Sequence, residues 1–393
     1  MDEVDNPFAP GAGTQPPELA GREAVIDGVR VQLGRAMKGR ASKSLMILGL
    51  RGVGKTVLLN RIAEMAEELR MRVAMVEAPE EQTLGELLVP SLRTILFRLS
   101  SVDAAKDAAL RGLGVLRAFA SVFSVSAGGL EFKVEAESGS ADSGNLELDL
   151  PEVLLAVARA AEAAKDGVVI LIDEVQYLSK EDLSALIVSL HKISQKGLPL
   201  VFVGAGLPQL AGLAGEAKSY AERLFDYPEV GPLPDQDALE ALALPIQREG
   251  QEITEEALRR VVERTRGYPY FIQEWGYQVW NVAIGSPIDT DDVDQASELA
   301  LGRLDAGFFR VRLDRLTPRE RDYVRAMASL GPGPHRSGDI ATAMGLRVNQ
   351  AAPIRSGLIK KGMIYSPQHG DTAFTVPMFD EFMLRSIPNW NPP

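Results

Sequence analysis

The sequence has 393 residues, contains no cysteine, and has three histidines that lie far apart, His191, His335 and His369. The absence of cysteine excludes disulfides, cysteine nucleophiles, iron–sulfur clusters and cysteine-based zinc sites. A histidine metal cluster or a catalytic triad would have to be built from three distant histidines, which argues against both. Any chemistry must therefore come from carboxylates, lysine, arginine and hydroxyl groups, and the composition fits a reducing compartment.

Long apolar runs are also missing. No run approaches the ~18 apolar residues that a membrane-spanning helix needs. The start, Met-Asp-Glu-Val-Asp, lacks the basic and then apolar pattern of a signal peptide. We therefore expect a cytoplasmic protein without a membrane partner. The formal net charge is -12, and such an acidic average argues against binding nucleic acid over the whole surface.

Short apolar runs and helical patterns alternate in the first half of the chain. Residues 45–48 and 72–77 are predicted strands, and residues 56–70 between them are a predicted helix. Val168–Ile172 is an unbroken run of β-prone apolar residues, which indicates a strand buried on both faces, and Leu200–Val203 is a similar run. This order predicts an α/β fold with a parallel sheet.

The strongest motif follows the first predicted strand and matches the pattern G-x-x-x-x-G-K-[ST] in full. Glycines allow the loop to curl so that backbone N–H groups point at phosphate oxygens, and the next helix adds its positive N-terminal end. Lys55 is predicted to reach the β- and γ-phosphates, and the Thr56 hydroxyl to bind Mg²⁺. The residues predicted to contact the nucleotide here are Gly49, Gly52, Val53, Gly54, Lys55, Thr56 and Val57.

Two acidic residues, Asp173 and Glu174, follow the buried strand at 168–172. Asp173 is predicted to hold Mg²⁺ through water, and Glu174 to polarise the attacking water as the general base. Acids that cap a strand-to-helix turn would look the same, but the phosphate motif upstream favours the catalytic interpretation. The chain lacks an Asn-Lys-x-Asp guanine-reading motif, and small-molecule P-loop kinases usually lack the second acid. The pair therefore predicts an ATP-hydrolysing P-loop protein.

These motifs resemble those of the AAA+ superfamily, and more closely the branch that contains origin-recognition-type initiators, STAND signalling ATPases and transposition regulators. Residues 19–23, Leu-Ala-Gly-Arg-Glu, resemble the motif that lies near the adenine, which implies a nucleotide contact for Arg22. Residues 173–178, Asp-Glu-Val-Gln-Tyr-Leu, resemble the second acidic motif of the branch. Residues 267–269, Gly-Tyr-Pro, resemble the Gly-x-Pro motif of the helical lid, which implies a contact for Pro269.

The chain departs from the AAA+ pattern in two places. The fourth strand of AAA+ proteins usually ends in a polar residue that senses the γ-phosphate, whereas this strand runs into Val203-Gly204-Ala205-Gly206. The lid of many AAA+ proteins supplies an arginine to the phosphates, but the matching place here is Pro269-Tyr270. Both departures favour slow hydrolysis and a nucleotide switch.

Arg223 follows the fourth predicted strand, at a place where an AAA+ arginine finger could lie. Such a finger would complete the site of a neighbouring protomer and stabilise the charge of the transition state. It would make Arg223 catalytic and the protein a homo-oligomer. A surface arginine in a salt bridge explains the residue equally well, so both interpretations stay open.

The acidic average hides a basic segment. Residues 301–361 hold twelve bases and five acids, a net charge of +7, so the rest of the chain carries -19. The pattern of this segment resembles a winged helix: a helix with a capping box at Thr317–Glu320, a short helix at 337–344, a third helix at 350–361, and a hairpin. A winged helix would place its third helix in a major groove, with arginines on the phosphates.

We therefore expect double-stranded DNA as a partner, contacted by Arg347, Arg355, Lys360 and Lys361. Winged helices also bind proteins, and the arginines of this segment can instead pair with the acidic remainder of the chain. Two functions stay open, and a third, a remodelling motor, would require a sustained turnover that the missing lid arginine argues against. The first is an ATP-controlled, slowly hydrolysing DNA-binding switch, and the alternative is a STAND-like signalling or defence ATPase whose C-terminal module binds a protein.

At ~150 residues per domain, the length predicts two or three domains. The first 18 residues contain four prolines and no base, which predicts an extended leader. The predicted segments are the leader at 1–18, a nucleotide-binding core at 19–233, a helical lid at 234–302 and a winged-helix domain at 303–393. A loop-rich insertion is expected at 126–150, with one strand hinted by the alternation at 130–134.

Overall fold

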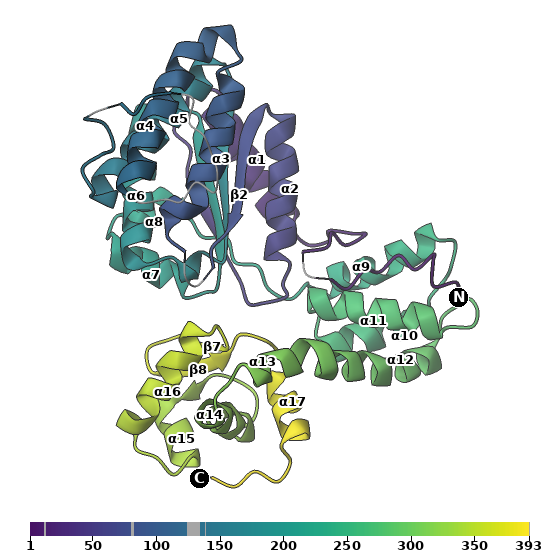
Figure 1. Cartoon of the computed structure of the whole chain (residues 1–393). Helices are drawn as coiled ribbons and strands as arrows, with labels where there is room; N and C mark the ends of the chain where they lie inside the picture. The colour runs from purple at the N-terminus through teal and green to yellow at the C-terminus, as the bar shows by residue number, and fades with distance from the viewer. Residues whose placement is uncertain (12, 80–81, 124–133, 138, 393) are drawn as a thin grey trace.

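The computed structural model describes residues 1–11, 13–79, 82–123, 134–137 and 139–392. Its main sheet has five parallel strands in the order β2-β3-β4-β1-β5 (Figure 1), which confirms the predicted α/β fold. These strands are β1 (Ser44–Leu48), β2 (Met71–Glu77), β3 (Gly167–Asp173), β4 (Leu200–Gly206) and β5 (Phe225–Asp226). β1, β3 and β4 are buried along their whole length, as expected for strands covered on both faces.

Helices cover both faces of the parallel sheet because successive strand residues point to opposite sides. On one face, Ile47, Leu171 and Val203 pack with α1 (Glu23–Met37) and α2 (Lys55–Glu68). The opposite face packs on a second group of helices through Met46, Ile170 and Phe202. The remaining helices of the core are α3 (Leu84–Leu99), η1 (Asp103–Ala105), α4 (Lys106–Val122), α5 (Leu146–Ala163), η2 (Val175–Tyr177), α6 (Lys180–Lys196), α7 (Leu210–Ala217) and α8 (Ala221–Leu224).

A helical lid follows the core. Its helices are α9 (Asp235–Arg248), α10 (Glu255–Thr265), α11 (Pro269–Val282) and α12 (Thr290–Arg303). α12 continues without a turn into the π-helical segment η3 (Leu304–Phe309) and then α13 (Arg310–Asp314). Figure 1 shows this continuous helical connector running from the lid into the C-terminal domain.

The C-terminal domain has the order α14–β6–α15–α16–β7–β8–α17. The bounds are α14 (Pro318–Ser329), β6 (His335–Arg336), α15 (Ser337–Ala343), α16 (Val348–Lys360), β7 (Ile364–Tyr365), β8 (Asp371–Phe374) and α17 (Phe379–Ser386). Its strands form an antiparallel sheet in the order β6-β8-β7. Phe309 joins this domain to the lid, because its ring lies 5.2 Å from that of Phe382 and 6.3 Å from that of Phe271.

The loop-rich insertion predicted at 126–150 is wrong at its C-terminal end. Residues 146–150 belong to α5, whose N-cap is Asn145; its side chain accepts a hydrogen bond from the Glu147 N–H. Leu150 is buried on this helix, so the acidic and polar composition of the stretch misled the prediction. Most of the strand hinted at 130–134 lies outside the described residues.

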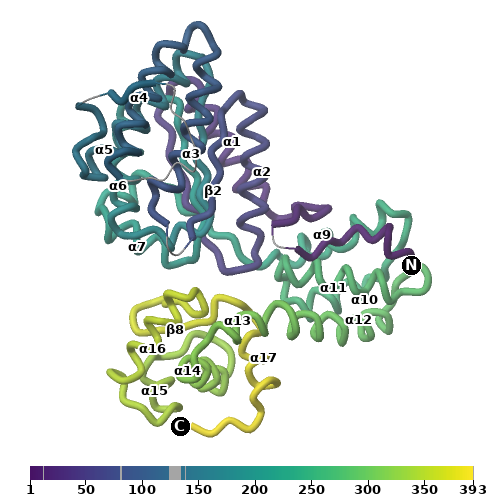
Figure 2. Tube along the Cα trace, viewed as in Figure 1, coloured from purple at the N-terminus to yellow at the C-terminus, as the bar shows by residue number. Residues whose placement is uncertain are grey.

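The described part of the leader lies along the lid and contains no helix or strand (Figure 2). Phe8 is only 2% exposed and packs against α11 at Gly276. The Asn6 side-chain amide donates hydrogen bonds to the Tyr277 carbonyl oxygen at 3.0 Å and to Asn281 Oδ1 at 2.7 Å. A proline-rich segment that forms no helix of its own is thus held in one conformation by the lid.

Among the described residues, no helix is both long enough and apolar enough to span a membrane.

The packing of Phe8 predicts that Gly276→Ala detaches the leader. A Cβ atom at residue 276 would lie 2.6 Å from the Phe8 ring, so the ring must leave its place. Limited proteolysis with thermolysin is expected to cut the leader of this variant faster than that of the unmodified chain.

Gly302→Ala in α12 is the matched control, since nothing lies within 4 Å of its added Cβ. It is expected to leave leader cleavage unchanged and to raise the free energy of unfolding by about 1 kcal/mol, because alanine favours helices. Equal cleavage rates in the two variants would contradict the assigned packing.

Candidate nucleotide site

The phosphate motif forms the loop between β1 and α2. Gly52 and Gly54 adopt positive φ angles of 81° and 90°, a backbone conformation that glycine adopts without strain. α2 begins at Lys55 and has no acidic residue in its first turn, so its positive N-terminal end is not neutralised locally. The loop and this helix end together have the geometry of an anion site.

Lys55 points back onto its own loop. Its Nζ donates hydrogen bonds of 2.9 Å to the carbonyl oxygens of Gly49 and Leu50, and the residue is 6% exposed. Burial lowers the pKa of Lys55, while the nearby carboxylates of Glu174 and Asp173 act in the opposite direction. Within the described residues, the hydrogen bonds of this buried ammonium group go to neutral carbonyls, so the group can exchange them for an anion.

The two residues predicted to hold Mg²⁺ lie side by side. The Thr56 hydroxyl donates to Asp173 Oδ2 at 2.5 Å, and Asp173 Oδ1 accepts from the Glu174 N–H at 2.8 Å. Burial raises the pKa of Asp173. Two adjacent hard oxygen donors suit Mg²⁺, which commonly takes few protein ligands and completes its shell with phosphate and water. No group of three or more potential metal-binding side chains occurs in the described part of the chain.

Glu174 has a left-handed backbone, with φ at 54°, which is uncommon for glutamate. The Gln176 side-chain amide donates a hydrogen bond to Glu174 Oε2. Gln176 Oε1 in turn accepts from the Leu207 N–H at 3.1 Å, just after β4. Gln176 therefore joins Glu174 to the end of β4, where Gly206 offers no side chain. Sequence reasoning assigned Gln176 no role, although it lies within the acidic motif.

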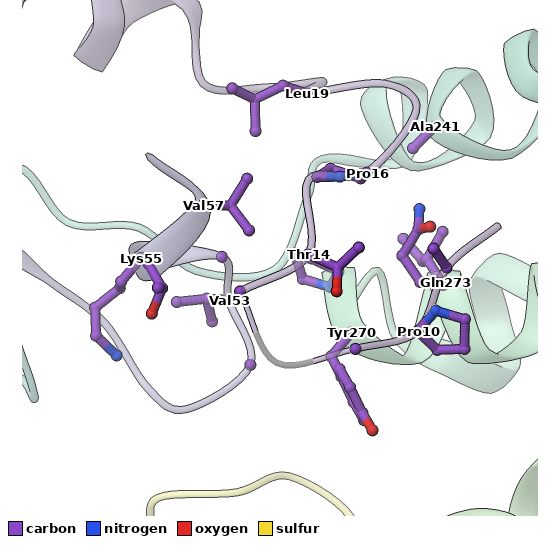
Figure 3. A pocket seen from close by; sticks show the side chains of 18 of the residues that line it. Pro10, Thr14, Pro16, Leu19, Val53, Lys55, Val57, Ala241, Tyr270 and Gln273 are labelled. Carbon is purple, nitrogen blue, oxygen red and sulfur yellow. The ribbon is translucent and has the colours of Figure 1, made fainter. Parts of the chain in front are cut away.

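A cavity of about 320 Å³ opens beside the phosphate loop. Its apolar lining includes Val53, Val57, Leu19, Ala241 and Ile272, and its polar lining includes Lys55, Thr56, Glu174, Arg51 and Arg312. In the view of Figure 3, Lys55 lies at one side and Gln273 of α11 at the other. Gln273 Oε1 is buried without a hydrogen-bond partner among the described residues.

The leader also lines this cavity, a role that sequence reasoning missed. Pro10, Thr14 and Pro16 contribute to the lining, and Figure 3 shows Thr14 between Val53 and the lid in that view. The Asn60 side-chain amide on α2 donates to the Gly13 carbonyl oxygen at 3.4 Å. The proline content indicated an extended segment but not where it would lie.

Arg22 contacts the phosphate loop and lies at the edge of the cavity. Arg22 is 8% exposed and donates to the carbonyl oxygens of Val53 and Gly231 at 3.2 and 2.5 Å. Burial lowers its pKa. Arg22 and Pro269, which is the first residue of α11, both line the cavity.

Tyr268 and Tyr270, on either side of Pro269, anchor the lid to the loop. The Tyr268 hydroxyl donates to the Arg51 carbonyl oxygen at 2.8 Å, and the Tyr270 N–H donates to the Gly52 carbonyl oxygen at 3.2 Å. Burial raises the pKa of Tyr268, so its hydroxyl stays protonated and remains a donor.

The C-terminal domain touches the same loop. The Arg51 N–H donates to the Thr375 carbonyl oxygen at 3.2 Å, while its guanidinium donates to the Tyr177 hydroxyl at 2.7 Å. We call the Arg51–Thr375 hydrogen bond the docking contact. An ion pair between Arg266 of the lid and Glu381 of α17 also joins the C-terminal domain to the lid.

Other predicted residues lie away from the cavity. Arg223 on α8 is exposed and does not line it. Arg355 donates to Thr372 Oγ1, Ser366 Oγ and the Asp371 carbonyl oxygen, each at 2.9 Å. Lys361 forms an ion pair of 2.7 Å with Glu320. Arg355 and Lys361 are thus engaged inside their own domain, whereas Arg347 and Lys360 are exposed.

Two family models match the chain. Residues 18–203 match an AAA ATPase domain, and residues 306–383 match a domain of unknown function. No curated protein matches the sequence. Together with the phosphate loop and the parallel sheet, the first match supports an AAA+ P-loop ATPase domain at residues 18–203, a class that binds nucleotides and in general hydrolyses ATP.

Solved structures resemble this chain, and one of them, with a TM-score above 0.5, shares its fold. A Walker-type ATPase of Pyrococcus abyssi is 18% identical, with a TM-score of 0.59, and the alignment covers 94% of this chain and 97% of that chain. The RuvB Holliday junction branch migration motor of Thermotoga maritima is 16% identical, with a TM-score of 0.47 and coverages of 97% and 100%. The Orc1 protein of Aeropyrum pernix, solved in complex with DNA, is 15% identical, with a TM-score of 0.48 and coverages of 95% and 94%. At these scores neither of the last two bears on the function of this chain.

The lid anchor predicts that Tyr268→Phe lowers the free energy of unfolding by about 1 kcal/mol, because it removes a partly buried hydrogen bond to the Arg51 carbonyl oxygen. Urea unfolding measures the change. Tyr277→Phe in α11, the helix whose N-cap is Tyr268, is the control, since the Tyr277 hydroxyl makes no hydrogen bond within the described residues, and it is expected to leave stability unchanged. An equal loss in both variants would show that the anchor contributes nothing.

Proposed function

We propose that the cavity binds ATP and that the protein hydrolyses it slowly as a nucleotide-controlled switch. The apolar lining around Val53 and Val57 suits the adenine, and the unpartnered Gln273 Oε1 can accept a hydrogen bond from its exocyclic amine. The phosphates then lie at the polar end, on the loop N–H groups and Lys55. Arg22 positions the phosphate loop by donating a hydrogen bond to the Val53 carbonyl oxygen.

In this proposal, the Thr56 hydroxyl and the Asp173 carboxylate hold Mg²⁺, which supplies charge neutralisation to the phosphates when it is bound. Lys55 leaves its two loop carbonyls and neutralises the β- and γ-phosphate oxygens. Glu174 accepts a proton from the attacking water. Gln176 holds Glu174 Oε2, which orients the carboxylate and keeps it from turning freely.

The expectation of low turnover rests on what surrounds the phosphates. β4 has the sequence Leu-Val-Phe-Val-Gly-Ala-Gly and ends in Gly206, so it has no polar side chain to offer the site. The lid offers Tyr270 where many AAA+ proteins have an arginine. Arg223 remains a proposed finger for a neighbouring protomer; its exposed position on α8 is compatible with that role and with a homo-oligomer.

The docking contact is the observation that carries the switch. It joins the backbone of Arg51, inside the phosphate motif, to Thr375 after β8. Since phosphate binding rearranges Lys55 and the loop carbonyls it now contacts, the nucleotide acts on the loop that holds the C-terminal domain. We propose that nucleotide state thereby controls how this domain is presented.

For the output of the switch, we propose binding of double-stranded DNA through a winged helix. The order α14–β6–α15–α16–β7–β8, with an antiparallel sheet, supports that assignment. Arg347, Asn349 and Gln350 are exposed at the start of α16 and are residue types that read base edges. Recognition helices present such residues from their N-terminal turn.

Two substitutions test the ATPase site. Lys55→Ala is expected to weaken ATP binding at least about 10-fold, because it removes a charge-assisted contact. Glu174→Gln is expected to retain ATP binding and to lower the hydrolysis rate about 100-fold or more, because the general base is lost. Calorimetric titration and phosphate release measure the two effects. Lys180→Ala and Glu181→Gln, exposed on α6, are the controls. Normal hydrolysis by Glu174→Gln would refute the general-base assignment.

DNA binding is tested by fluorescence anisotropy of a labelled duplex across salt concentrations, with and without ATP. Arg347→Ala and Lys360→Ala are each expected to weaken binding and to reduce the slope of log affinity against log salt by about 1. Lys196→Ala, exposed on the core, is the control. If the unmodified chain does not bind duplex DNA at low salt in either state, the DNA proposal fails, and a protein partner of a STAND-like ATPase becomes the better hypothesis.

A further inference from the structure

Arg312 is a cation that faces the nucleotide cavity from outside both the core and the lid. It belongs to α13, in the helical connector that leads from the lid to the C-terminal domain. It lines the same cavity as Lys55, Arg51 and Glu174. The sequence did not predict that Arg312 lines the cavity, because Arg312 lies far from the phosphate motif along the chain and is one of many bases in its segment.

A short series of contacts positions the Arg312 side chain. Its guanidinium donates to the Phe308 carbonyl oxygen and lies 3.9 Å from the centre of the Phe308 ring. The Phe308 ring stacks on Tyr270 with 4.7 Å between the ring centres. The Tyr270 N–H donates to the Gly52 carbonyl oxygen. Arg312 is therefore tied to the phosphate loop through two aromatic rings and needs little reordering to meet a ligand.

The charges around Arg312 are those of an anion site. Burial, and next the nearby Arg51, lower the pKa of Arg312 to about 10, whereas Tyr270 and Glu174 act in the opposite direction. The side chain stays charged at neutral pH. Among the described residues its hydrogen bond goes to a carbonyl and not to a carboxylate. The Nε of Arg51 is likewise buried without a partner there. Arg51 and Arg312 are partly buried, and Glu174 is the one acidic group that acts on Arg312 here, so positive charge remains in the cavity for a polyphosphate to compensate.

We infer that Arg312 binds the β- and γ-phosphates of the nucleotide, and so supplies from the connector the phosphate-binding arginine for which this lid has Pro269-Tyr270. This inference rests on the proposed ATP binding. Because Arg312 precedes α14, its contact with the phosphates holds the connector, and with it the C-terminal domain, against the site. A nucleotide with more phosphates therefore binds Arg312, and with it the C-terminal domain, more tightly to the site.

The test is calorimetric titration of ATP and of AMP into the full chain and its Arg312 variants. Arg312→Ala is expected to weaken ATP binding about 10- to 100-fold, as for a lost charge-assisted hydrogen bond, and to leave AMP binding unchanged. Arg312→Lys keeps the charge but not the planar fork, so an intermediate ATP affinity is expected. Arg310→Ala, exposed in the same helix, is expected to change neither affinity.

Each other outcome overturns the inference. Unchanged ATP binding by Arg312→Ala refutes it directly, and an equal loss for ATP and AMP shows that Arg312 acts only on the shape of the cavity. If Arg312→Ala does not fold, Arg312→Lys decides: weaker ATP with unchanged AMP binding supports the inference, and unchanged ATP binding refutes it. Failure of the unmodified chain to bind ATP refutes the proposed function itself, which distinguishes that result from the others.

Discussion

The backbone of the phosphate loop is the constraint on which the other parts depend. The lid reaches it through the Tyr268 hydroxyl and the Tyr270 N–H, and the C-terminal domain accepts a hydrogen bond from the Arg51 N–H. Arg22 fixes the far side of the loop through Val53. A loop made partly of glycine has little side-chain packing of its own, so these hydrogen bonds define its shape. Any ligand that moves the loop acts on several parts of the chain at once.

The charged side chains also gather around the phosphate loop. Lys55, Arg51 and Arg312 converge on one cavity, while Glu174 and Asp173 are the acids nearest to Lys55. Burial opposes the charged state of both Lys55 and Asp173, because it lowers the pKa of the first and raises that of the second. In the proposed function, bound phosphates and Mg²⁺ compensate these opposite charges together, so the nucleotide and the cation stabilise the site jointly.

Much of the core could be predicted from the sequence, because local signals there agree with the tertiary fold. The run Val168–Ile172 lies in a strand buried on both faces, and the phosphate motif lies between a strand and a helix, as its pattern required. The prediction was wrong where composition opposed burial. The stretch 126–150 is rich in Gly, Ser, Glu and Asp and looks like a loop, yet Asn145 caps a helix that begins at Leu146, and Leu150 is buried against the core.

The sequence by itself determined four strands of the sheet, the phosphate loop and the two acids after β3, because each depends on residues that are neighbours in the chain, whereas β5 and the order of the strands depend on pairing between distant segments. The tertiary structure decided which distant residues meet at that loop. Thr14 from the leader, Gln273 from the lid and Arg312 from the connector come together in one cavity. It also decided that Arg355 and Lys361 bind within their own domain. Such contacts depend on how helices pack, and no local pattern of residue types encodes that packing.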